Sequence, residues 1–338
     1  MSRTAVVILN WNGKAFLEKF IPSVLAHMPD GDVLYVADNG SDDGSVELLV
    51  QRWPEDVRLV LMDRNYGFTG GYDRALKQIG EETAEEFDYY VLLNSDIEVT
   101  AGWLSELEDF MDARPRCAVC APKILSYDMR GWFEHAGASG GFVDRWYFPY
   151  CRGRILATVE EDKGQYDTPC RVFWASGAAF MIRAGVWKEM GGLDENFFAH
   201  MEEIDLCWRA MLAGWEIWVD PRAAVYHVGG GTLPNNSPRK LYLNFRNNLL
   251  MMYKNLPQRS RSRIIFWRMC VDGAIACIYL LTGKLSFCRS VMSAHRDYRK
   301  MRRNVQVSAH RFAVPRSRVS IIRLALGGFR YPSGKVVE

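Results

Sequence analysis

The first hundred residues repeat one arrangement: a short apolar run, then polar side chains, then in most cases an amphipathic helix pattern. The apolar runs at residues 6–9, 33–37, 57–61 and 89–93 are rich in β-branched and aromatic side chains, which predicts buried strands. Apolar residues at helical spacing follow the first three runs. Strands that alternate with helices predict an α/β fold with a mainly parallel central sheet flanked by helices.

Polar residues follow each predicted strand where it ends, namely Asn10, Asp38, Asn65 and the tract Asn94-Ser95-Asp96. Because the carboxyl ends of parallel strands share one sheet edge, where open α/β sheets bind ligands, we expect these residues to line one crevice. The oxygen atoms of the last tract suit a hard divalent cation that carries phosphates. Alternatively, Ser95 or Asp96 caps a following helix.

Several function classes are disfavoured. Gly67, Gly70 and Gly71 do not form the GxGxxG fingerprint of nicotinamide cofactor sites, and we interpret them as a loop that lets backbone approach a ligand. The eight cysteines include only one close pair, Cys117 and Cys120, which predicts a reduced, cytosolic protein without a zinc site. We expect neither a signal peptide, because the first apolar run is too short, nor a membrane span.

Three carboxylates, Glu202, Glu203 and Asp205, lie within four positions near a predicted helix start. Acidic residues there stabilise the helix dipole, or one of them is a general base whose pKa is raised by its neighbours and by burial. His227 follows an apolar strand and is either a packed residue or, if Asp96 holds a cation, a second ligand. Arg246 either faces a diphosphate or solvates a helix.

The chain from residue 257 onward is strongly basic, whereas the preceding part is acidic. Residues 263–282 are apolar but interrupted by Arg268 and Asp272, which predicts an amphipathic helix at a membrane interface rather than a span. Docking of this helix on the protein body is the alternative. The basic residues predict an anionic partner. The neighbouring apolar helix favours a membrane surface over nucleic acid.

Taken in order, these motifs resemble the inverting family 2 glycosyltransferases, including their rhamnosyltransferase-like members, over residues 4–256. The resemblance rests on residues 6–13, 38–45, 65–68, 92–96, 176–177 and 202–209, and on His227. It implies a GT-A fold with a catalytic domain over residues 1–256, divided into a nucleotide-binding half, 1–120, and an acceptor-binding half, 121–256. A basic, helical extension would follow over residues 257–338.

The resemblance also implies roles for single residues. The nucleotide site would contain Leu9, Asn10, Asn12, Asp38, Asn65, Gly67, Asn94 and Ser95. Asp96 and His227 would bind Mg²⁺ or Mn²⁺, and Arg246 would face the diphosphate. Trp174, Ser176, Gly177 and the loops at 126–170 would shape the donor and acceptor pockets. Glu203 would be the general base, with Glu202 orienting it and Asp205 as the alternative base.

The chain departs from the family pattern at two positions, because Asn94 replaces the first Asp of the DxD motif and Glu203 stands where Asp is usual. The implied function is metal-dependent, inverting transfer of a hexosyl group from a UDP- or dTDP-linked sugar to a glycan or lipid-linked glycan. Such transfer would build cell envelope polysaccharide in the cytoplasm, at the inner face of the membrane. The alternatives are a catalytically altered nucleotide-sugar-binding protein and, with a poorer match at residues 10–14, a sugar nucleotidyltransferase.

Overall fold

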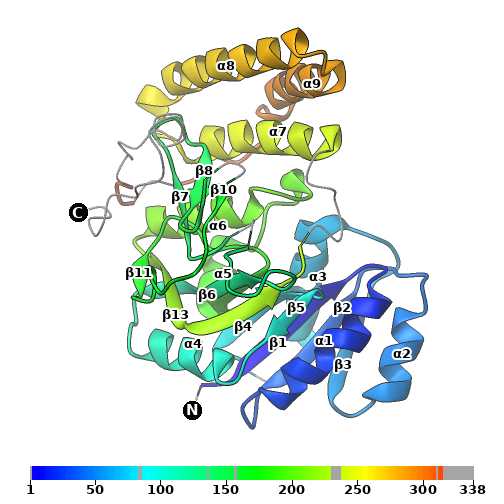
Figure 1. The fold of residues 1–338 in the computed structure, drawn as a ribbon. Coiled ribbons are helices and arrows are strands. Elements are labelled where there is room, and N and C mark those ends of the chain that lie inside the picture. Colours follow the sequence, from blue (N-terminus) through cyan, green and yellow to red (C-terminus); the bar gives the residue numbers. More distant parts are fainter. Residues whose placement is uncertain are drawn as a thin grey trace.

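The computed structural model describes residues 2–82, 86–134, 137–155, 158–229, 237–309 and 311–314. Its main sheet has the strand order β11-β13-β6-β12-β4-β1-β2-β3, with β5 paired to β13 (Figure 1). The strands of this sheet are β1 (Thr4–Asn10), β2 (Val33–Asp38), β3 (Val57–Leu61), β4 (Tyr89–Asn94), β5 (Ile97–Val99), β6 (Cys117–Ser126), β11 (Cys170–Arg171), β12 (Ala179–Arg183) and β13 (Glu216–His227).

The amino-terminal half of the sheet is parallel, as the sequence predicts. Strand β1 pairs in parallel with β2 and β4, and the register places Asn10 beside Asp38 and Leu9 beside Asn94. The polar ends of these strands therefore meet at one edge. The whole sheet is mixed, because β12 runs antiparallel between β4 and β6.

Helices cover both faces of this sheet. Within β1, Val6 and Ile8 pack in one core and Ala5 and Val7 in the other, as the period of two requires. The first core includes residues of α1 (Lys14–Ala26), α2 (Ser45–Arg52) and α4 (Trp103–Asp112). The second includes residues of α3 (Gly67–Glu82), α5 (Ala184–Met190) and α6 (Glu202–Ala213).

Strand β13 carries the chain back to the ligand-binding edge. The sequence predicts two strands here, at 215–219 and 224–226, but the structure contains one strand with a shift of register between Asp220 and Ala224. The buried Asp220 carboxylate accepts hydrogen bonds from the backbone and guanidinium of Arg222, which stabilises the irregular segment. Beyond it, His227 pairs with Ile97 at the start of β5.

Two interpretations of loops are wrong. Residues 126–170 contain a second sheet, antiparallel, formed by β7 (Gly141–Val143), β8 (Pro149–Cys151), β9 (Arg154–Ile155) and β10 (Thr158–Val159). The predicted glycine loop is the first turn of α3, where a Cβ on Gly71 would lie 2.7 Å from Leu9 Cδ1. Gly71 therefore allows helix α3 and strand β1 to approach one another.

The remaining elements are the 3₁₀ turn η1 (Glu195–Phe197) and the helices α7 (Pro238–Asn255), α8 (Gln258–Leu281) and α9 (Leu285–Met301). Contrary to the expectation from sequence, α8 is long and apolar enough to cross a membrane by length and composition, and it alone is so among the described residues. After α9 the chain returns to α6, where Phe312 N donates to Leu212 O. Residues 315–338 of the predicted tail, and the glycines at 230 and 231, lie outside the described residues.

Candidate active site

The ends of β1 and β2 form a polar cradle. Asp38 is buried, and its carboxylate accepts hydrogen bonds from Asn10 Nδ2 at 3.0 Å and from Ser41 N at 2.8 Å. Asn12, at a φ of 52°, exchanges hydrogen bonds with Asp42, which fixes the loop after β1 against the loop after β2. Asn10 Oδ1 is buried without a hydrogen-bond partner in the described part of the chain, so it remains available to a donor on a ligand.

Asn39 links this cradle to the next loop, a role that the sequence analysis missed. Its buried side chain donates to Gly67 O at 3.0 Å and to Asn65 Oδ1 at 3.2 Å, and it accepts from Tyr66 N at 2.9 Å. Gly40 follows at a φ of +75°, where a Cβ would lie 2.6 Å from Arg64 Cα. The position of Gly40 directly after Asp38 and Asn39, where a strand ends, is the sequence feature that could have indicated this linking role.

Asp96 and His227, predicted to share a site, are in contact. His227 Nε2 lies 3.1 Å from Asp96 Oδ1, both side chains are buried, and Val228 N donates to Asp96 O. Glu134, which the sequence analysis missed, places Oε2 at 3.5 Å from His227 Nδ1. Burial lowers the pKa of His227, but the hydrogen bonds and charges of Asp96 and Glu134 outweigh it and raise the pKa to about 10.

The Asp96–His227 pair fits a divalent cation in one respect. Its carboxylate oxygen and imidazole nitrogen, 3.1 Å apart, are both atom types that bind divalent cations. Within the described residues, no group of three or more His, Cys, Asp or Glu side chains is arranged to hold a metal ion. The pair therefore offers two atoms of suitable type, fewer than a divalent cation binds.

Glu202 and Glu203 begin α6 after a turn of unusual backbone. Phe198, His200 and Met201 all have positive φ, between 65° and 76°. The Oε2 atoms of Glu202 and Glu203 are buried, and neither has a hydrogen-bond partner in the ranges that the structure describes. Burial raises the pKa of Glu203 to about 7, and burial together with the Glu203 charge raises the pKa of Glu202 well above its ordinary value.

Gly177 packs closely against Phe68 and Glu203. A Cβ at Gly177 would lie 3.2 Å from Phe68 Cζ and 3.8 Å from Glu203 Cβ. The next residue, Ala178, accepts a hydrogen bond from Asn94 N, so this segment joins Glu203 to the Asn94-Ser95-Asp96 tract. Ser176 is buried in the same segment, and its Oγ accepts from Ala178 N. Glu203 and the predicted metal ligands therefore lie around the same strand ends.

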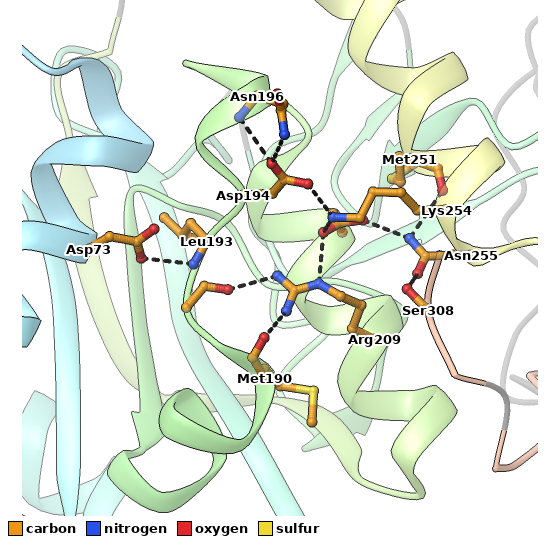
Figure 2. Close-up of polar contacts among 12 residues, drawn as sticks. Asp73, Met190, Leu193, Asp194, Asn196, Arg209, Met251, Lys254, Asn255 and Ser308 are labelled. Atoms are coloured by element: carbon orange, nitrogen blue, oxygen red, sulfur yellow. Dashed lines mark hydrogen bonds and ion pairs between the residues drawn. The ribbon is translucent and has the colours of Figure 1, made fainter. Parts of the chain in front are cut away.

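Asp205 has a different environment from its neighbours, and Figure 2 labels three of the residues that bond it, Arg209, Lys254 and Asn255. It is fully buried, and Oδ2 accepts from Arg209 Nε and Lys254 Nζ, each at 2.8 Å. Oδ1 accepts from Asn255 Nδ2 at 2.7 Å. Lys254 also pairs with Asp194 at 2.6 Å, so two carboxylates and two cations form one neutral cluster. Asp205 anchors α6 to α7 and has no oxygen left for proton transfer.

Arg246 and Trp174 also have structural contacts that the sequence did not predict. Arg246 Nη2 donates to Asn196 O and Phe197 O, which holds η1 against α7 rather than leaving the guanidinium free. The adjacent Asn247, missed by the sequence analysis, donates to the carbonyls of Phe197, Ala199 and His200 and fixes the turn before Glu202. Trp174 is buried and donates Nε1–H to Phe142 O, so its ring is part of the core instead of a sugar platform.

Comparison with known proteins gives concordant results. Residues 5–186 match the family model described as Glycosyl transferase family 2. The chain is 30% identical over 242 residues to the N-acetylglucosaminyl-diphospho-decaprenol L-rhamnosyltransferase of Mycobacterium tuberculosis strain H37Rv, an alignment that covers 66% of this chain and 75% of the relative. It is 22% identical over 212 residues to the dTDP-rhamnosyl transferase RfbF of Shigella flexneri, covering 60% of this chain and 64% of that protein.

Solved structures share the fold. The Staphylococcus aureus TarS 1–349 complex with UDP-GlcNAc superposes with a TM-score of 0.57 at 16% identity, covering 88% of this chain and 80% of that chain. The GalNAc-T7 structure with UDP, GalNAc and Mn²⁺ has a TM-score of 0.58 at 15% identity, covering 75% of this chain and 48% of that chain.

Proposed function

Because the chain belongs to glycosyl transferase family 2 and has the GT-A fold, we propose that it transfers a sugar from a UDP- or dTDP-linked donor to a lipid-linked glycan, with inversion at the anomeric carbon. Glycosyl transfer from a nucleotide sugar is the activity of the family. The observation that best supports the inverting mechanism is Glu203, whose Oε2 is buried without a hydrogen-bond partner among the described residues and whose pKa burial raises to about 7.

The donor nucleotide would lie along the ends of β1, β2 and β4. Asp38 and Asn10 would bind the base, and the exposed Asn12 and Asn65 would line the same site with Leu9, Gly67, Asn94 and Ser95. A carboxylate at Asp38 suits the ring N–H of uracil or thymine. Asn39 would keep the loops of this site in place through its bonds to Tyr66 and Gly67.

Asp96 and His227 would hold Mg²⁺ or Mn²⁺ on the donor diphosphate, with Glu134 orienting the imidazole of His227. When bound, the cation would stabilise the negative charge that develops on the departing nucleoside diphosphate. Asn94, which replaces the first acid of the DxD motif, would contribute its backbone and position rather than a charge. No acid catalyst is then needed, because the leaving group departs without protonation.

Glu203 would act as the general base. It would accept the proton of the acceptor hydroxyl as the hydroxyl oxygen forms a bond to the anomeric carbon. On the opposite face, the bond from that carbon to the diphosphate oxygen would break, so one displacement inverts the centre. A carboxyl group with a pKa near 7 is both partly ionised at neutral pH and basic enough to take the proton. Glu202, whose pKa is raised well above its ordinary value by burial and by the charge of Glu203, would orient the base as its neighbour at the start of α6.

Two relatives support the choice of substrates. One is named for L-rhamnosyl transfer with N-acetylglucosaminyl-diphospho-decaprenol, a lipid-linked sugar diphosphate, and another for dTDP-rhamnose. We therefore propose a lipid-linked acceptor and a location at the cytoplasmic face of the cell membrane, with residues 1–256 as the catalytic domain and the chain after 257 as its membrane-facing extension.

The test combines binding and turnover. We expect nucleoside diphosphates with Mn²⁺ to raise the melting temperature of both the wild type and Glu203→Gln. Transfer from the matching nucleotide sugar should fall by about 10²–10⁴-fold in Glu203→Gln. Glu47→Gln, an exposed glutamate in the first turn of α2, is the matched control and should keep normal turnover. Normal turnover in Glu203→Gln would show that Glu203 is not the general base. Donor binding that does not depend on Mn²⁺ would contradict the proposed role of the cation.

A further inference from the structure

Helix α8 has its polar and apolar sides reversed relative to a helix on a water-soluble surface. Two charged residues in the middle of the helix, Arg268 and Asp272, are buried, 1% and 0% exposed, whereas Arg259 and Arg263 near its start are exposed. Five of its large apolar side chains are exposed, namely Phe266, Trp267, Ile278, Leu280 and Leu281, whereas Ile264 and Ile265 are buried. Surface helices normally turn the apolar stripe inward, so this arrangement requires an apolar environment outside the protein.

The exposed residues form one continuous stripe. Phe266, Trp267, Cys270, Ala274, Cys277, Ile278 and Leu281 recur at spacings of one, three and four, which place them on the same side of α8. The stripe continues past the turn at 282–284 to Leu285 on α9, which is 52% exposed. From Cys270 to Leu281 the exposed positions carry no charge. We name this surface, from Phe266 to Leu285, the outer face of α8.

The buried charges fix the opposite side of α8 to the enzyme. Arg268 Nε donates to Asp272 Oδ1 at 2.8 Å, and its Nη1 donates to Trp146 O and to Asn248 Oδ1. Asp272 also lies 3.3 Å from His295 Nε2 of α9. To cross a bilayer, α8 would have to expose this ion pair to lipid, at a cost of several kcal/mol. The contacts therefore allow one side of α8 to enter lipid but oppose a transmembrane arrangement.

Basic residues border the outer face. On α9, Arg289, Arg296 and Arg299 are exposed in the same stripe as Leu285 and Met292. A hollow of about 510 Å³ on α9 is lined by Met292, Ser293, His295, Arg296 and Arg299. Cations next to an apolar stripe match the anionic headgroups and acyl chains of a membrane surface. Figure 1 shows α8 at the end of the molecule opposite α1 and α2.

We propose that the outer face of α8 lies in the interfacial layer of an anionic lipid bilayer, with the arginines of α9 on the headgroups, so that the enzyme is held on one leaflet without crossing it. This inference deepens the membrane location proposed above and rests on that part of the proposed function. It does not depend on catalysis. It also assigns Arg268 and Asp272 the task of holding α8 to the body while its other side is in lipid.

Two native cysteines provide the probe, because Cys270 and Cys277 are exposed on the outer face. We expect both thiols to react readily with a charged, membrane-impermeant maleimide in solution. Liposomes of phosphatidylcholine and phosphatidylglycerol should slow the reaction at least about tenfold. Cys170 on β11, partly exposed at the far edge of the main sheet, is the internal control and should react at the same rate in both conditions. Mass spectrometry of peptides assigns the label to each cysteine.

Matched variants complete the test. Ile278→Glu with Leu281→Glu should raise the lipid concentration needed for protection by about tenfold or more, whereas Val50→Glu on α2, a residue 54% exposed, should behave as wild type. Glu203→Gln should be protected normally, which separates this proposal from the catalytic one. Unchanged reactivity of both thiols with liposomes would overturn the proposal. So would protection that appears without lipid as protein concentration rises, because a second copy would then cover the face. Equal protection by phosphatidylcholine alone would refute the role of the arginines.

Discussion

Replacing Lys254 with methionine tests whether the buried cluster around Asp205 holds α6 in place. Lys254 is 4% exposed and lies 2.8 Å from Asp205 and 2.6 Å from Asp194. Methionine keeps most of the side-chain volume but removes the charge. Breaking a buried ion pair from one side costs about 3–5 kcal/mol, because the partner charge stays buried. Arg209 and Asn255 continue to neutralise and bond Asp205, so we expect the lower end, about 3 kcal/mol.

The measurement is the free energy of unfolding from urea titration, with Lys77→Met as the matched control. Lys77 has a side chain 72% exposed and a distant i,i+4 partner, Glu81, at 4.0 Å, so its loss should cost less than about 0.5 kcal/mol. Adding Asp194→Asn to Lys254→Met should recover part of the loss, because Asp194 pairs with Lys254 and its charge is then removed as well.

The pH dependence gives a second readout. Burial alone would raise the pKa of Asp194, but Lys254 and nearby hydrogen bonds hold it below the ordinary value. A lowered carboxylate pKa adds stability above the unfolded pKa, and this stability is lost as the pH falls through the folded value. The penalty of Lys254→Met should therefore shrink below about pH 4. A loss no larger than that of Lys77→Met at neutral pH would refute our account of the cluster.

Three further predictions follow from the site. Turnover should rise with pH through about 7, because Glu203 must lose its proton to act as the base, and a pH profile of kcat that is flat between 6 and 8 would contradict this. Gly40→Ala should destabilise the protein by more than Gly31→Ala in thermal melts. Both residues have positive φ, but a Cβ at Gly40 would lie within 3 Å of backbone atoms, whereas a Cβ at Gly31 would meet open space. Equal losses of about 1–2 kcal/mol each would mean that only the backbone strain of the positive φ matters. Chelation by EDTA should abolish the rise in melting temperature that nucleoside diphosphate causes in the wild type. Asp96→Asn should show little rise even with Mn²⁺, and a full rise in that variant would contradict the role of Asp96 as a cation ligand.

The sequence predicts the features that depend on local pattern. The apolar runs with polar ends place Asn10 and Asp38 side by side, because period-two strands in a parallel sheet leave few other registers. The pairing of His227 with Asp96 was reached through the family resemblance and agrees with their contact. The GT-A fold was predicted on the same grounds.

Contacts between distant segments could not be read from any such pattern. Lys254 and Asp205 are 49 residues apart, and neither position signals the other. Gly67 looked like part of a loop, although Tyr72, Leu76 and Ile79 at helical spacing outweigh the roughly 1 kcal/mol cost of each helical glycine. Arg268 and Asp272 looked like a polar side facing water, because sequence cannot show that an i,i+4 pair neutralises itself inside the protein.

The return of the chain from α9 to α6 affects how the protein is made. Ser308 Oγ donates to Asn255 Oδ1. The ring of Phe312 packs against Gly214, at the end of α6, so closely that a Cβ there would lie 2.6 Å from the ring. Ribosomes add about 5–20 residues per second. On the order of 100 residues separate the end of α6 from Phe312, so the nascent helix waits roughly 5–20 seconds for its last packing partner. During that interval the segment that becomes the outer face of α8 is synthesised, so the membrane contact that we propose can form before α6 has its last packing partner.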